Sequence, residues 1–421
     1  MVFISAKRWS LFFLDTGLVF RTGCEDTNGA YYKSNRESGI EQGGNSSARK
    51  ALSIRIFVLV QNKFPFLKKR VLVAPLEWGL GHATRCVPVI RELLRQDAEV
   101  ILAADGRPFD FLEKEFPELP ILRFPGYGIS YPGNSWLGLH LVLRSPLIMR
   151  NIRREKKQIE RMVDEHSIDI IISDNRFACR SAKTLNVYIT HQLNVKAPFA
   201  QNFIAKTHRN YYDRFDQVWV PDAEGKRNLS GELGHTGDNN PFIRYTGPLT
   251  RFADADPWNS RPLKWWLVVM LSGPEPQRSI FERIVLEELP KFTEDVLVIR
   301  GIPGEAPLPA HSLPHVTIVN HLPASQLKEA LLSTHHVLCR PGYSTLSDLA
   351  ALDVSPVVVP TPGQTEQEYL AEYHAAQNHL VHVRQKKLNL GEAIRMKTQM
   401  LPFSVLPDHA LLEKRVRSIL K

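Results

Sequence analysis

The sequence predicts an α/β protein with two Rossmann-like domains that follow one another along the chain. Three observations support this prediction. The chain has 421 residues, which is enough for two domains of ordinary size. From residue 70 onwards, short apolar strands alternate with amphipathic helices. The same unit, an apolar strand followed by a glycine loop and a helix, begins at residue 71 and again at residue 265.

The composition restricts the class of partner. The net charge of +9 favours an anionic partner, such as a nucleotide diphosphate, an acidic membrane surface or a nucleic acid. We find no basic and aromatic nucleic-acid module, so we expect no nucleic-acid partner. No uncharged apolar run reaches about 18 residues, and no membrane-spanning helix is predicted. The four cysteines show no CxxC spacing and fit a reducing, cytoplasmic environment.

Residues 1–69 are not expected to belong to either domain. The apolar segment 9–20 is interrupted by Asp15, and no small-residue cleavage site of the usual kind follows it. Residues 22–49 are polar and rich in Gly, Asn and Ser, which is typical of disordered chain. We interpret 1–69 as a disordered or poorly structured extension, with a translated upstream segment and a targeting segment as the two explanations.

The first domain is predicted to span residues 70–240. It opens with a strand at 71–75 and a loop in which Gly79 and Gly81 allow the backbone to approach a ligand. The helix that follows carries its apolar residues on one face. The remaining strands are expected at 99–104, 121–124, 168–173, 187–190 and 217–220.

His82 stands at the start of this first helix. There its side chain could hydrogen-bond an anionic or hydroxylic ligand, and the ordinary pKa of an imidazole suits a general base. The alternative is a histidine that caps or packs the helix, because short glycine motifs often occur without a ligand. The residues alone leave both interpretations open.

Polar residues follow two of the predicted strands. Asp174, Asn175 and Arg176 come directly after strand 168–173, and His191 follows strand 187–190. Open α/β sheets bind ligands beyond the carboxyl ends of their strands. These side chains are therefore predicted to bind the acceptor, and the alternative is a hydrogen-bonded network within the loops.

A basic segment follows an apolar one between residues 136 and 161. Seven basic residues stand against two acidic ones within 144–161. An apolar stretch followed by a basic one is what a peripheral contact with an anionic membrane requires. A long core helix with a solvated basic face would give the same pattern, so both interpretations stay open.

The second domain is predicted to span 265–421, after a polar, proline-containing linker at 241–264. Its first strand leads to a glycine loop at Ser272 and Gly273. This loop is not a Walker loop, because no GK[ST] follows it. Closing helices are expected near 392–400 and 410–420, and the last one could pack back on the first domain.

The stretch 338–370 carries the clearest site pattern. Pro341 and Gly342 break the chain after a buried strand, and Ser344 and Thr345 can cap the helix that follows. Free N–H groups at a helix start bind anions such as a diphosphate. Asp348, one turn further, could accept sugar hydroxyls. A second loop offers further polar groups for a sugar, at Gln364, Thr365, Glu366 and Gln367. The alternative is an ordinary unit of capped helices.

These residues resemble a known family. The runs RPGYSTLSDL at 340–349 and PTPGQTEQ at 360–367 look like the C-terminal domain of family 28 glycosyltransferases. The run GLGH at 79–82 resembles a reduced form of the glycine loop in MurG-like enzymes. The similarity covers residues 70 to about 385. It implies the GT-B architecture: two Rossmann-like domains that face each other across a cleft, no essential metal or cofactor, and a UDP-sugar held mainly by the C-terminal domain.

The resemblance also implies roles for single residues. Gly342, Ser344 and Thr345 would meet the diphosphate, Asp348 the ribose and Gln367 the donor sugar. Ser272 and Gly273 would close on the phosphates, and His82 would assist the acceptor. Arg251 matches a basic residue at the end of the family's linker. The full set expected at the donor comprises Arg251, Ser272, Gly273, Arg340, Gly342, Ser344, Thr345, Asp348, Gln364, Glu366 and Gln367.

Two departures from the family pattern bear on the substrate. Asp348 stands where the family usually has Glu, and the first loop lacks the doubled glycines, which argues against peptidoglycan synthesis proper. We therefore expect a cytoplasmic hexosyltransferase that moves a hexose or N-acetylhexosamine from a UDP-sugar, with inversion, to an envelope glycan or lipid-linked acceptor. It could contact the inner face of the cytoplasmic membrane. The alternatives are a UDP-sugar 2-epimerase and a non-catalytic sugar-nucleotide-binding partner subunit.

Overall fold

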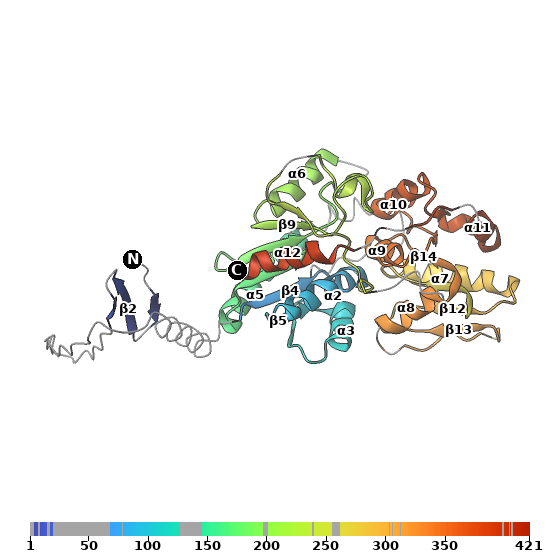
Figure 1. The fold of residues 1–421 in the computed structure, drawn as a ribbon. Helices are drawn as coiled ribbons and strands as arrows, with labels where there is room; N and C mark the ends of the chain where they lie inside the picture. Colours follow the sequence, from blue (N-terminus) through green and yellow to red (C-terminus); the bar gives the residue numbers. More distant parts are fainter. Residues whose placement is uncertain are drawn as a thin grey trace, which may run out of the picture. The chain divides into compact units, whose positions relative to one another are not determined.

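The computed structural model describes residues 4–6, 9–14, 17–19 and 68–421, apart from 78, 127–144, 197–200, 238–239, 255–261, 303, 305, 312, 398–399, 404 and 406 (Figure 1). The chain divides into two compact units, Met1–Phe66 and Leu67–Lys421. In the first unit, three short strands, β1 (Ile4–Ala6), β2 (Trp9–Leu14) and β3 (Gly17–Val19), form an antiparallel sheet. The disorder expected at 22–49 falls outside the described residues.

The first domain of the larger unit contains a parallel sheet of seven strands in the order β10-β9-β8-β7-β4-β5-β6. Because β5 and β6 extend the sheet on one side of β4 while β7 to β10 extend it on the other, the strand order reverses between β4 and β7. The strands are β4 (Arg70–Pro75), β5 (Glu99–Ala104), β6 (Ile121–Arg123), β7 (Ile170–Asp174), β8 (Leu185–Ile189), β9 (Gln217–Val220) and β10 (Ile243–Tyr245).

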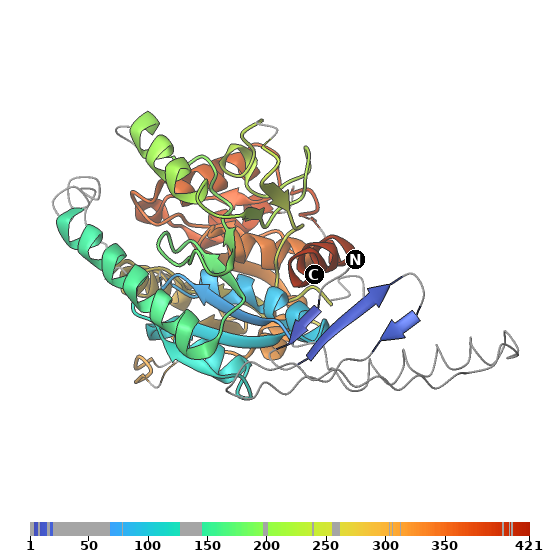
Figure 2. The same cartoon turned by 90° about the vertical axis from the view of Figure 1, so that its left-hand side faces the viewer.

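Helices cover both faces of this sheet, because its central strands are apolar on both sides. Val71 and Val73 of β4 belong to one core, with the buried face of the first helix, whereas Leu72 and Ala74 belong to the opposite core, beneath Ile159. The helices are α2 (Leu80–Arg95), α3 (Gly106–Glu115), α5 (Ser145–His166) and α6 (Gln201–Tyr212), with the short turn η1 (Gly231–Leu233). Figure 2 shows α5 as the long helix on the left.

The second domain contains a parallel sheet of six strands in the order β13-β12-β11-β14-β15-β16. Its order reverses between β11 and β14. The strands are β11 (Trp265–Met270), β12 (Val296–Ile299), β13 (Val316–Val319), β14 (Thr334–Cys339), β15 (Val357–Val358) and β16 (Val381–His382). Its helices are α7 (Gln277–Glu288), α8 (Ala324–Leu332), α9 (Tyr343–Ala351), α10 (Thr365–Ala375) and α11 (Leu390–Met396), with turns η2 (Leu289–Lys291) and η3 (Gln385–Lys387).

Two segments near the domain borders join the first domain. The stretch expected as a linker, 241–264, contains β10, which pairs in parallel with β9. The last helix, α12 (His409–Leu420), packs back on the first domain, where Leu412, Val416 and Ile419 enter the core beneath α2. Within the described residues, no helix combines the length and apolarity that crossing a membrane needs.

Candidate functional site

The strand order reverses between β4 and β7 in the first sheet and between β11 and β14 in the second. The loops that follow these strands meet at the contact between the domains. The glycine loop after β4 lies against the start of α9, where the Ser344 hydroxyl donates to the Gly81 carbonyl over 2.7 Å. A side chain at Gly81 would stand 3.3 Å from Ser344 Oγ, so glycine permits the close approach. Tyr343, also at the start of α9, donates from its hydroxyl to the Pro221 carbonyl. The expected acceptor loop and the expected diphosphate helix are thus brought together.

A buried ionic group lies beside this contact in the first domain. Asp174, at the end of β7, is fully buried. It accepts hydrogen bonds from Arg85 on both carboxylate oxygens, and His82 Nδ1 lies 2.9 Å from Oδ1. His82 Nε2 makes no hydrogen bond in the described part of the chain, and 14% of the His82 side chain is exposed. Asp174 therefore orients an imidazole whose other nitrogen has no partner among the described residues.

The second domain contributes to the same group through Glu366, near the start of α10. Glu366 Oε1 lies 2.8 Å from His191 Nε2, and its other oxygen accepts from Gln192. The His191 ring also stacks on Tyr343 with a centroid distance of 4.3 Å. His191, which the sequence predicted at the rim of the first sheet, is therefore buried between the two domains.

The charges of this group shift one another's pKa values. Burial favours the neutral form of Asp174, but the charges and hydrogen bonds of Arg85 and His82 together outweigh burial and lower the pKa of Asp174 to about 2. Burial and the nearby Arg85 charge lower the pKa of His82. Burial works to raise the pKa of Glu366, yet the pKa is lowered because His191 faces the carboxylate. Near neutral pH, the group thus holds two carboxylates, one guanidinium and a neutral His82.

Four expected donor residues line an open rim at the carboxyl ends of β11 and β14. Ser272, Gly273, Gly342 and Thr345 are all partly exposed. Met270 and Cys339 pair in the sheet, so the loops that follow these strands start side by side. Backbone groups at this rim and at the start of α9 are available to an anion.

Asp348, which the sequence predicted at the ribose, is bonded to protein groups in the structure. It is only 4% exposed. Its Oδ1 accepts from Thr250 Oγ1 over 2.7 Å, and its Oδ2 accepts from Arg251 Nε over 2.9 Å. In the structure, Asp348 and Arg251 join α9 to the segment that follows β10.

Other expected site residues hold backbone in place. Arg340 is fully buried and donates to the carbonyls of Val359 and Pro360 over 2.8 and 2.9 Å, and burial lowers its pKa to about 9. The Gln367 side chain accepts from the Thr361 backbone N–H over 2.8 Å. Both side chains therefore position the loop between β15 and α10, in which Gln364 lies.

The same holds for two predicted acceptor-side residues. Arg176 is fully buried and donates to the carbonyls of Phe124 and Pro125 over 3.0 and 2.7 Å. Asn175 adopts a left-handed backbone with φ of 56°, and its side-chain oxygen accepts from Tyr188. For Arg176 and Asn175, the loop network that the sequence left open is what the structure contains.

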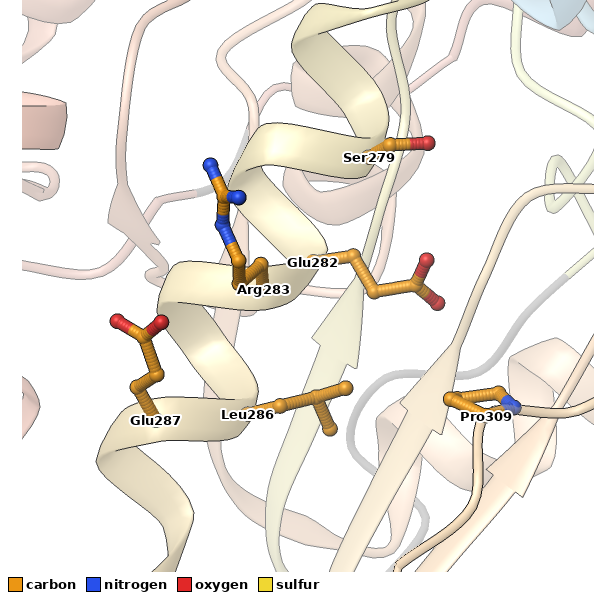
Figure 3. Close-up of a pocket in the computed structure, with 6 residues that line it drawn as sticks. All are labelled: Ser279, Glu282, Arg283, Leu286, Glu287 and Pro309. Carbon is orange, nitrogen blue, oxygen red and sulfur yellow. The ribbon is translucent and has the colours of Figure 1, made fainter.

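A surface pocket lies elsewhere, along α7. It is lined by Ser279, Glu282, Arg283, Leu286, Glu287 and Pro309 (Figure 3). In Figure 3, Glu282 and Leu286 point toward Pro309. None of the predicted site residues lines this pocket, so we place the site at the contact between α2 and α9 instead. No group of three or more metal-ligating side chains is found among the described residues.

Comparisons with known proteins show similarity to glycosyltransferases. A family model described as glycosyl transferase family 1 matches residues 70–204, the part that contains His82 and Asp174. A protein of Methanosarcina acetivorans named as an uncharacterized glycosyltransferase is 24% identical in an alignment of 319 residues, and the match covers 69% of this chain and 79% of that protein. A match to family 28 itself remains a prediction.

Solved structures settle the architecture. The glycosyltransferase of kitacinnamycin is similar with a TM-score of 0.54 and 14% identity, covering 84% of this chain and 95% of that one. *Arabidopsis thaliana* UGT89C1 complexed with UDP has a TM-score of 0.54 and 15% identity, covering 84% and 94%. The fold is that of the GT-B glycosyltransferases. The comparisons together support a glycosyltransferase of the GT-B type.

Sequence reasoning missed three residues of the site. Arg85 lies three positions after His82, on the same side of α2, within an otherwise apolar face. A charged residue on a buried helical face needs a partner, and that signal could have identified it. Tyr343 and Gln192 gave no comparable signal, because their roles come from contacts with distant parts of the chain.

Proposed function

We propose that this protein transfers a hexose or N-acetylhexosamine from a UDP-sugar to a hydroxyl of a glycan or lipid-linked acceptor, with inversion at the anomeric carbon. The observation that carries the proposal is the His82–Asp174 pair, which lies next to the start of α9 and in which His82 Nε2 has no partner among the described residues. A base on one side and an anion-binding helix start on the other are what a direct displacement of a diphosphate needs.

His82 would act as the general base. With Asp174 accepting from Nδ1, the free Nε2 would take the proton of the acceptor hydroxyl as that oxygen attacks the anomeric carbon. The lowered pKa of His82 keeps the imidazole neutral, and thus able to accept a proton, at neutral pH. One attack in line with the departing group inverts the anomeric configuration.

The start of α9 would receive the departing diphosphate. Its first N–H groups and the positive end of the helix dipole offset the charge that develops on the leaving oxygen. Gly342 and Thr345 are partly exposed there, and Ser272 and Gly273 follow the neighbouring strand. A UDP donor agrees with the overall charge of +9 and with the UDP named for the similar UGT89C1 structure.

The test is a donor and acceptor screen that measures UDP release. We expect release that depends on an acceptor, a roughly 100-fold or greater loss of kcat in His82→Ala, and donor affinity by calorimetry that stays within about threefold. Wild-type kcat in His82→Ala would contradict the base role. Formation of an epimer without acceptor would instead establish a UDP-sugar 2-epimerase, and tight donor binding without any turnover a non-catalytic binder.

A lipid-linked acceptor would place the protein at an anionic membrane surface, and α5 offers the contact. Five cationic residues on one side of this helix are exposed, namely Arg150, Arg153, Arg154, Lys157 and Arg161. The apolar stretch before α5 lies within residues 127–144, outside the described residues. We infer a peripheral contact in which these charges meet acidic headgroups at the inner face of the cytoplasmic membrane.

We expect the protein to float with vesicles that contain acidic lipid, and the triple variant Arg153→Ala, Arg154→Ala, Lys157→Ala to float much less, since each charge contributes about 1 kcal/mol. The control removes three charges from exposed or half-exposed positions elsewhere, with Lys68→Ala, Lys291→Ala and Arg417→Ala. Equal flotation of both variants would reject α5 as the contact.

A further inference from the structure

Five side chains form a continuous hydrogen-bonded chain across the contact between the domains. In order they are His82, Asp174, Arg85, His191 and Glu366. Four of them come from the first domain and one from α10 of the second. Arg85 is the central member: it is 2% exposed and contacts Asp174, His82 and His191. Burying a guanidinium is costly unless nearby groups compensate the loss of its hydration. Arg85 finds these compensating partners within this one ionic group.

The chain fixes the proton of His191. Arg85 Nη1 lies 2.7 Å from His191 Nδ1. A guanidinium can only donate, so Nδ1 must be the accepting nitrogen. In the neutral ring, the proton is then on Nε2, which lies 2.8 Å from Glu366 Oε1 and donates to it. His191 therefore joins Arg85 to Glu366 with a defined direction of hydrogen bonding.

At His82 the chain permits two arrangements. His82 Nδ1 lies 2.9 Å from Asp174 Oδ1 and 2.7 Å from Arg85 Nη2. A protonated Nδ1 donates to Asp174 and leaves Nε2 able to accept a proton. An unprotonated Nδ1 accepts from Arg85, and the proton then occupies Nε2, where it blocks general-base action. Which of the two forms is present depends on where Arg85 directs its N–H groups.

We propose that Arg85 is a positioning residue that couples Glu366 of the second domain to the tautomer of His82 in the first. With Glu366 docked, His191 accepts from one arm of Arg85 and holds the guanidinium on Asp174, so that His82 donates to Asp174 and Nε2 is free. Without Glu366, the proton of His191 is no longer held on Nε2, so His191 Nδ1 is no longer fixed as the acceptor of Arg85. Arg85 then competes with Asp174 for His82 Nδ1. The base is then assembled only when the two domains meet. The catalytic consequence rests on the proposed function of His82.

The titration of His82 tests this without turnover. The charged and titratable groups facing His82 are Arg85, Asp174, His191 and Glu366. In the full-length protein with ¹⁵N-labelled histidine, His82 can be assigned by its loss in His82→Gln. We expect Arg85→Met to raise the pKa of His82 by about one unit, because a nearby positive charge is removed. The control, Arg95→Met on the exposed side of α2, should leave it unchanged. An unchanged pKa in Arg85→Met would overturn the proposal.

Coupling to Glu366 needs a second measurement. Arg85→Lys retains the charge but not the fork that reaches both Asp174 and His191. We expect Glu366→Gln to lower the pKa of His82 in the wild-type background and to lower it by less than half as much in Arg85→Lys. A direct charge effect of Glu366 on His82 would be equal in both backgrounds, and that result would overturn the coupling. Arg85→Lys also remains informative if Arg85→Met does not fold.

Kinetics then separate this proposal from the proposed function. In an active preparation, the acid limb of kcat/KM against pH, which reports the free enzyme, should move to higher pH in Arg85→Met, following the raised pKa of His82. In Arg85→Lys, the limb should stay near its wild-type position while kcat falls roughly tenfold or more. If the protein transfers no sugar, the nitrogen titrations still decide the role of Arg85. An acid limb that stays in place while the His82 titration moves would show that His82 is not the base.

Discussion

At the scale of single residues, burial decides which polar side chains are free to bind a ligand. Arg176, Arg340 and Asp348 were predicted to touch substrates, and each is instead buried and bonded to neighbouring protein groups. A buried charge without a partner costs several kcal/mol, so such residues remain in a fold only when the protein itself satisfies them. His82 differs from them because one of its ring nitrogens is left open.

Asp348 provides a direct test of this distinction. Asp348→Ala removes the acceptor of two buried donors and leaves the Arg251 charge unpaired, so we expect a loss of about 3–5 kcal/mol in the free energy of unfolding. Chemical denaturation measures this. The matched control, Glu232→Ala, removes an exposed carboxylate paired with Lys196 and should leave the stability nearly unchanged. A fully stable Asp348→Ala variant with weakened UDP binding would instead support Asp348 as the residue that binds the ribose.

At the scale of elements, the start of α9 presents the free N–H groups with which a helix can bind a phosphate. The helix begins at Tyr343 immediately after Gly342, and its first turn carries Ser344 and Thr345. Ser344 is engaged with Gly81 of the other domain, whereas Gly342 and Thr345 remain partly exposed. An incoming phosphate would therefore approach over Gly342.

Gly342→Ala tests whether the phosphate approaches the helix over Gly342. Gly342 has an ordinary φ of −72°, and an added Cβ would meet nothing closer than Thr345 Oγ1 at 3.9 Å. The variant should fold with an unchanged Tm, because neither strain nor a clash is introduced. A methyl group on the path of the phosphate should weaken UDP binding by roughly tenfold or more, measured by calorimetry. Gly304→Ala, where a Cβ also meets nothing, is the control. Unchanged UDP affinity in Gly342→Ala would place the diphosphate elsewhere.

The elements themselves could largely be predicted from the sequence, because they depend on local periodicity. The strand expected at 71–75 is β4 (Arg70–Pro75), and the helix expected after Gly81 is α2. The strand β10 was not predicted, since three partly buried residues carry no period and acquire a strand conformation only by pairing with β9. The orientation of polar side chains at the strand ends was equally inaccessible, because it is set by partners far away in the sequence.

At the scale of the whole Leu67–Lys421 unit, contacts from distant parts of the chain tie the two domains together. The site depends on bonds that join residues more than 170 positions apart, such as His191 with Glu366 and Gly81 with Ser344. The site is therefore a property of the docked domains, and neither sheet contains it alone. A second connection runs through α12, which follows the second domain in sequence yet belongs to the core of the first.

A substitution within α12 should therefore destabilise the first domain. Ile419 is 5% exposed and lies in the core that also contains Val87 and Ile90 of α2. Ile419→Ala should cost about 2–5 kcal/mol, because it leaves a cavity between α12 and the first domain. Hydrogen exchange followed by mass spectrometry should then show faster exchange in peptides from β4 and α2, with those from β11 and α7 less affected. Lys414→Ala, at an exposed position of the same helix, should change neither. Because the effect would appear in the domain more than 300 residues away in sequence, exchange confined to the second domain would contradict the packing of α12 on α2.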